Sequence, residues 1–145
     1  MLNFIFVLIV AIIVTGINLT VIFSATEPGW QQMIASGVFL VFWLLFAMYK
    51  GLNREKLFNR FVLLFWGVGL ILSFVGMLNG LRAVAITSLL IFTGPSYGIF
   101  YNMSGGTIGT QYVLLAVLTP LVMALIGYFV GKIIGTVEIV QPEKK

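Results

Sequence analysis

The first 49 residues of the chain carry a single formal charge, Glu27, and it separates two long apolar runs. The hydrocarbon core of a bilayer is about 30 Å thick, so a helix rising about 1.5 Å per residue needs about 20 apolar residues to cross it. A helix is required because it satisfies its own backbone hydrogen bonds where water is absent. The two runs, 4–23 and 31–49, are therefore predicted to be membrane-spanning helices joined by a short polar turn.

The rest of the chain continues this pattern. Of its 145 residues, 61% are hydrophobic and 8% are charged, whereas a soluble domain is about 45–50% apolar. Four segments are long and apolar enough to span readily: 4–23, 31–49, 61–79 and 112–132. We expect an all-α fold, a polytopic membrane helix bundle forming one integral membrane domain over 1–145, with a short polar tail at 136–145. The first run lacks the basic start of a secretory signal and is expected to be retained.

A fifth apolar segment, 83–101, is weaker because the sequence Gly94-Pro95-Ser96-Tyr97-Gly98 interrupts it. Its Leu, Ile and Phe side chains are too apolar for an aqueous loop, since each is worth about 1.5–3 kcal/mol of transfer free energy. The segment either crosses the membrane with a kink at Pro95 or enters the membrane and turns back. A turn at that depth is tolerated only where protein or a wet cavity covers the backbone.

Basic residues predict the orientation of the helices. The connection between the second and third spans is the densest basic cluster of the chain, with Lys50, Arg54, Lys56 and Arg60. By the positive-inside rule this connection and the N-terminus face the cytoplasm, and we expect the cell membrane as the location. Five crossings leave four basic residues inside and four outside, while four crossings leave seven inside and one outside. Because complete spans are commoner than re-entrant segments, we expect five and keep four as the alternative.

The residue types of the chain limit its chemistry. It contains no Cys, His or Asp, so it lacks the thiolate, the commonest metal ligand and the usual general base. The glutamates all lie outside the predicted spans: Glu27, Glu55, Glu138 and Glu143. An enzyme needs a nucleophile beside an oriented base, and no such pair is visible. We expect a protein that is not an enzyme, with no cofactor and no metal site.

Glycines recur at four-residue spacing on two of the predicted helices. Such spacing puts positions without a side chain on one helix face and lets another backbone approach closely. These helix-packing positions are Gly127, Gly131 and Gly135 in the last span, and Gly76 and Gly80 in the third. We expect packing within one bundle, and the alternative is an interface with a second copy or a larger membrane-protein partner.

Several polar or conformationally unusual residues interrupt the apolar segments. Asn18 is expected to form a hydrogen bond to another helix, because an amide in hydrocarbon needs a partner. Arg82 is expected to extend toward the headgroups, and the alternative is a polar recess with Asn79, Thr87 and Ser88 that attracts an anion. The expected hinge consists of Gly94, Pro95 and Gly98.

These observations favour a small non-catalytic membrane protein that acts as an accessory or self-associating component of a membrane complex. The alternative is a small oligomeric channel, or a subunit that binds a solute or lipid at the Gly94–Gly98 break. The expected partners are membrane lipids and either further copies of the chain or a larger membrane protein. The basic connection at 50–60 is read as a topology signal or a lipid contact. Nucleic acid is not expected, because the net charge of +4 comes from residues that flank apolar runs.

Overall fold

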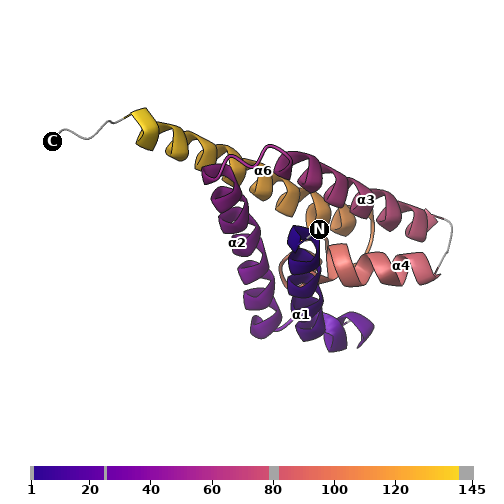
Figure 1. Ribbon diagram of the computed structural model, residues 1–145. Helices are drawn as coiled ribbons and strands as arrows, with labels where there is room; N and C mark the ends of the chain where they lie inside the picture. The colour runs from indigo at the N-terminus through magenta and orange to yellow at the C-terminus, as the bar shows by residue number, and fades with distance from the viewer. Residues whose placement is uncertain (1, 25, 79–81, 141–145) are drawn as a thin grey trace.

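The computed structural model describes residues 2–24, 26–78 and 82–140, and these residues contain helices and no strand (Figure 1). The elements are α1 (Leu2–Ser24), α2 (Trp30–Leu52), α3 (Phe58–Leu78), α4 (Arg82–Ser88), a π-helical segment η1 (Leu89–Thr93), a 3-10 turn η2 (Gly94–Ser96), α5 (Tyr97–Met103) and α6 (Thr110–Val140). Within them, five helical segments are long and apolar enough to cross a membrane. The expected all-helical membrane bundle is confirmed.

The helix bounds differ from the predicted spans mainly at α6. This helix starts at Thr110 and runs to Val140, so it continues into the stretch expected to be a polar tail. The Arg54 guanidinium donates hydrogen bonds to the Gly135 carbonyl at 3.1 Å and to the Thr136 hydroxyl at 3.2 Å, which holds the late turns of α6 against the connection between α2 and α3. Residues 141–145 lie outside the described part of the chain.

Helices α2 and α6 run parallel and share the closest contact in the bundle. A Cβ at Gly127 would overlap the Leu44 carbonyl oxygen, and one at Gly135 would lie 3.0 Å from the Leu52 carbonyl oxygen. Gly131 lies between these two positions and faces the same helix. The paired residue numbers rise together, so the two helices point the same way, and the glycine face of α6 is occupied within the chain.

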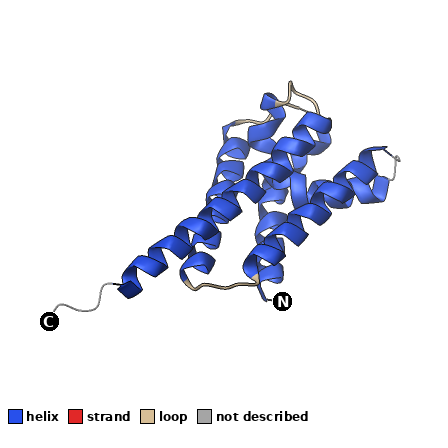
Figure 2. Ribbon diagram, turned by 90° about the horizontal axis from the view of Figure 1, so that it is seen from above, coloured by secondary structure: helices blue, strands red, loops and turns tan. Residues whose placement is uncertain are grey.

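Helices α1 and α3 run antiparallel to this pair. The Phe6 ring near the start of α1 lies 5.7 Å from the Phe46 ring near the end of α2. The Phe58 ring at the start of α3 stacks on the Tyr128 ring at 5.8 Å, while the end of α3 borders the start of α6 through Met77 and Val113. The start of α1, the α2–α3 connection and the late turns of α6 therefore lie at one end of the bundle (Figure 2). We call this the basic end.

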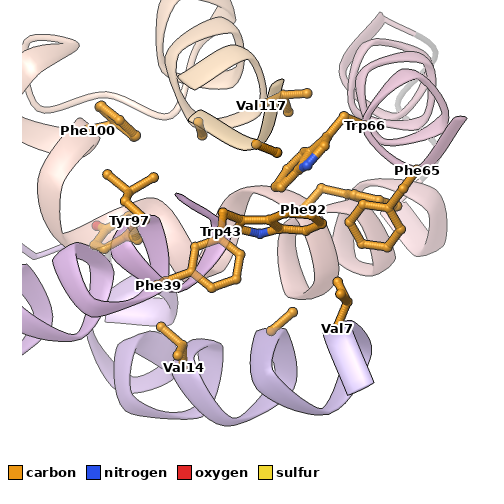
Figure 3. Packing of buried hydrophobic residues seen from close by; sticks show 14 of the residues in the cluster. Val7, Val14, Phe39, Trp43, Phe65, Trp66, Phe92, Tyr97, Phe100 and Val117 are labelled. Carbon is orange, nitrogen blue, oxygen red and sulfur yellow. The ribbon is translucent and has the colours of Figure 1, made fainter. Parts of the chain in front are cut away.

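Aromatic side chains fill the centre of the bundle. The rings of Trp43 and Trp66 lie 5.3 Å apart, and those of Phe65 and Phe92 lie 5.0 Å apart. Trp43 and Trp66 are fully buried, and Figure 3 shows them at the centre of the cluster. They join α2 and α3 to η1, so the interrupted segment is anchored in the core.

The interrupted segment reverses direction in the middle of the bundle. From its start it runs back along α3, with Ala85 against Gly76 and Phe92 against Gly69. From Leu90 onward it moves along α1 toward the end opposite the basic end, and Gly98 reaches the start of α2. The segment thus begins and finishes at the same end of the bundle, which we call the loop end.

Candidate functional site

The reversal is built from a local change of helix type between Leu89 and Ser96. In η1 the Gly94 amide donates to the Leu89 carbonyl, five residues back, and Pro95 then contributes no amide hydrogen. Both features leave backbone carbonyls without their usual helical donors. Residues 92–96 are buried and residues 89–91 are half-buried, so the carbonyls need partners from neighbouring helices.

Side chains of the surrounding helices supply those partners. The Thr15 hydroxyl donates to the Leu90 carbonyl at 2.7 Å, and the Asn18 amide donates to the Gly94 carbonyl at 2.8 Å. From the other side, the Tyr112 hydroxyl donates to the Thr93 carbonyl at 2.6 Å. The interrupted backbone is therefore held from α1 and α6 together.

The backbone amide of Gly98, just after the break, has a hydrogen-bond partner on α2. The Gly98 amide donates to the Ser36 hydroxyl at 2.9 Å, and Ser36 is fully buried. A Cβ at Gly98 would overlap the Gln32 carbonyl oxygen. The glycine predicted as part of a hinge thus lies where two backbones touch, and it is fixed between α2 and the break.

A small recess opens beside the first half of the segment 82–103, which runs along α3. It has a volume of about 160 Å³ and lies between α3, α4 and the start of α6, near the loop end. Its polar groups are three buried hydroxyls, those of Ser73, Ser88 and Thr93, and the first two are hydrogen-bonded to each other. No charged side chain is among its lining residues in the described part of the chain. Because the Ser73 hydroxyl donates to the Gly69 carbonyl at 2.7 Å, the serine pair offers the recess hydrogen-bond acceptors, and the recess has no charge to offer an ion.

The structure divides the polar recess expected around Arg82. Ser88 lines the recess just described, whereas Thr87 is exposed on another face and donates to the Ala83 carbonyl at 2.9 Å. Asn79 and Gly80 lie outside the described residues, and the structure describes only the backbone of Arg82.

Sequence reasoning missed the residues that complete the site, Ser36, Ser73 and Tyr112. Each is a polar side chain in a mostly apolar helix, which is also true of Asn18. Serines are common at helix contacts in membranes, so their presence alone gave no reason to select them. An unpartnered carbonyl near Pro95 is the signal that points to a need for such donors.

Two polar atoms of this region have no hydrogen-bond partner among the described residues. They are the Asn18 side-chain oxygen and the Ser96 hydroxyl, and both residues are fully buried. A buried polar group without a partner is costly, by about 1–3 kcal/mol. The two atoms mark the centre of the break as its least satisfied part.

The basic connection makes contacts within the chain. Lys50 forms an ion pair with Glu55 at 2.6 Å, and Arg54 holds α6 as described above. Lys56 and Arg60 are exposed. The four cations thus divide into two that serve the fold and two that face outward.

Comparison with protein-family models, with curated proteins and with solved structures finds no match for this chain.

Proposed function

We propose that the chain crosses the membrane four times, by α1, α2, α3 and α6, with its N-terminus, the 50–60 connection and its C-terminus in the cytoplasm. The parallel course of α2 and α6 supports this arrangement, because parallel helices cross in the same direction. Among the described residues, the basic end carries Lys50, Arg54, Lys56, Arg60 and Lys132, in keeping with the positive-inside rule. Length alone favours five crossings, whereas helix direction and charge both favour four.

In this arrangement the segment 82–103 is re-entrant from the outer side. Its deepest contact with α3 is that of Phe92 with the Phe65 ring, 13 residues before the end of that helix at Leu78. Thirteen residues correspond to about 20 Å, so the segment reaches past the middle of the hydrocarbon without crossing it. The donors from α1 and α6 and the Ser36 acceptor on α2 supply the protein cover that such a turn requires.

The function that this geometry supports best is non-catalytic binding of a small uncharged polar molecule at the re-entrant segment. The recess lined by Ser73, Ser88 and Thr93 carries the proposal. Its volume of about 160 Å³ equals that of about five water molecules, so it fits a compound of a few heavy atoms. The aromatic core lies beneath it, so a single copy acts by binding and does not form an open channel.

Cysteine labelling tests this proposal cleanly, because the native chain has no cysteine. Ser73→Cys should react with methyl methanethiosulfonate added outside, and glycerol or urea should slow the reaction. Ser36→Cys is the matched control, since Ser36 is also buried but does not line the recess. Failure of Ser73→Cys to react faster than Ser36→Cys would reject an accessible recess.

An accessory or self-associating role remains a second candidate, for a specific reason. Gly16 has open space where its Cβ would be, and Thr20, one turn later, is exposed. This leaves one small face on α1 unused after the glycines of α6 have packed internally. Oxidation of Gly16→Cys in native membranes should produce a disulfide-linked dimer, whereas exposed Ile71→Cys on α3 should not; equal dimer yields would reject the role of this face.

A further inference from the structure

A second site lies at the basic end, where two cations meet one groove. The groove has a volume of about 360 Å³ and is lined by Phe129, Lys132, Ile133 and Thr136 of α6. Arg54 reaches the same place from the α2–α3 connection, donating to the Thr136 hydroxyl at 3.2 Å. Lys132 and Thr136 are one helical turn apart, and the Thr136 hydroxyl donates to the Lys132 carbonyl at 2.8 Å.

The acid that follows Arg54 in the chain, Glu55, is paired with Lys50 at 2.6 Å. Among the described residues, Lys132 and Arg54 have no carboxylate within ion-pairing distance. Both cations border the groove, Lys132 as a lining residue and Arg54 through its bond to Thr136, and two like charges at one groove favour an anion between them.

The rest of the groove specifies the kind of anion. Phe129 and Ile133 are 53% and 64% exposed, and they continue the groove along the apolar surface of α6. An inorganic ion would leave this apolar part unused, whereas a lipid would place its phosphate at the cations and an acyl chain along the ring. The position also fits, because the groove lies at the end of the bundle where α6 leaves the hydrocarbon.

We infer that Arg54 and Lys132 form a clamp for the phosphate of an anionic phospholipid on the cytoplasmic side, with Phe129 and Ile133 receiving its acyl chain. The clamp is independent of the recess at the loop end, since the two share no residue. It also joins the α2–α3 connection to α6, so a bound lipid would stabilise the contact that Arg54 makes with the late turns of α6.

The test is native mass spectrometry of the full-length protein in mild detergent, titrated with phosphatidylglycerol or phosphatidylcholine. One phosphatidylglycerol should bind more tightly than phosphatidylcholine. Lys132→Gln should weaken its binding about five-fold, the equivalent of about 1 kcal/mol per basic residue, and Lys132→Arg should restore it. Lys56→Gln is the control, because Lys56 is also an exposed cation at the basic end but does not line the groove.

Three outcomes would overturn the clamp. They are equal affinity for the two lipids, equal weakening by Lys56→Gln and Lys132→Gln, and displacement of the lipid by inorganic phosphate, which would assign the site to a free anion. Arg54→Gln should also weaken binding, but Arg54 supports α6 and has a left-handed backbone (φ 53°), so its effect is read only if the circular dichroism spectrum is unchanged. Lys132→Gln, on the exposed face, decides the question without that condition.

Discussion

The contact between α2 and α6 allows the strongest prediction, because its tolerance of an added methyl group can be worked out from backbone positions. A Cβ at Gly131 would overlap the Met48 carbonyl oxygen. Forcing extra volume into a packed contact costs about 1–3 kcal/mol, and a backbone carbonyl has no rotamer by which to move away. Alanine recovers up to about 1 kcal/mol as a better helix former than glycine. Gly131→Ala should therefore destabilise the fold by about 2 kcal/mol, which is about 30-fold in the unfolding equilibrium.

The measurement is reversible unfolding of the purified protein by sodium dodecyl sulfate in mixed micelles, followed by circular dichroism. Gly16→Ala is the matched control, because nothing lies within 4 Å of its added Cβ. That variant should be unchanged or up to about 1 kcal/mol more stable. Gly135→Ala should fall between the two, since its nearest carbonyl oxygen is 3.0 Å from the Cβ position.

The order of these three variants is the critical result. If Gly131→Ala were as stable as Gly16→Ala, α2 and α6 would not be in backbone contact. Their parallel course, and the four-crossing arrangement that depends on it, would then be rejected. A loss of stability equal in all three variants would instead indicate a general intolerance of alanine and would carry no information on the contact.

Three further variants test the aromatic core and the side-chain hydrogen bonds to the break, by the same unfolding measurement. Asn18→Ala removes the bond to the Gly94 carbonyl and should cost about 0.6–1.7 kcal/mol, the range for hydrogen bonds between membrane helices. Tyr112→Phe leaves the buried Thr93 carbonyl without its donor and should cost about 1–3 kcal/mol. Trp43→Ala opens a cavity at a fully buried position and should cost about 3–5 kcal/mol.

Each of these variants has an exposed counterpart, of the same residue type for Tyr112 and Trp43 and a polar residue of the same helix for Asn18. Thr20→Ala removes a polar group on the outer face of α1, Tyr49→Phe removes a hydroxyl from a ring that is 59% exposed, and Trp30→Ala truncates an indole that is 70% exposed. Changes of less than about 0.5 kcal/mol are expected for all three. An exposed variant that lost as much stability as its buried partner would refute the role assigned to that buried residue.

The helical class of the fold could be predicted from the sequence because the bilayer imposes a simple length rule. Each long apolar run had to be a helix, and the structure contains a helical segment in every run. Helix ends were less predictable where tertiary contacts extend an element. α3 starts at Phe58, before the apolar run begins, because that ring is buried against Tyr128.

The course of 82–103 could not be read from its own residues. The Gly94-Pro95 sequence marks an interruption, but whether the chain continues or turns back depends on donors from distant segments. Thr15 is 75 residues from its acceptor and Asn18 is 76 residues from its own. Hydrophobic periodicity contains no information about such pairs. The sequence therefore located the break and left its direction open.

The cover of the break is completed in a fixed order during synthesis. α1 and α2 are synthesised before Leu90, so the Thr15 donor and the Ser36 acceptor are already present when the segment follows. Tyr112 follows its acceptor Thr93 by 19 residues and reaches it only after α6 enters the membrane. Until then the Thr93 carbonyl lacks its side-chain donor. The last helix thus acts as the closing step of assembly, and a chain terminated before Thr110 should be a substrate for membrane proteases.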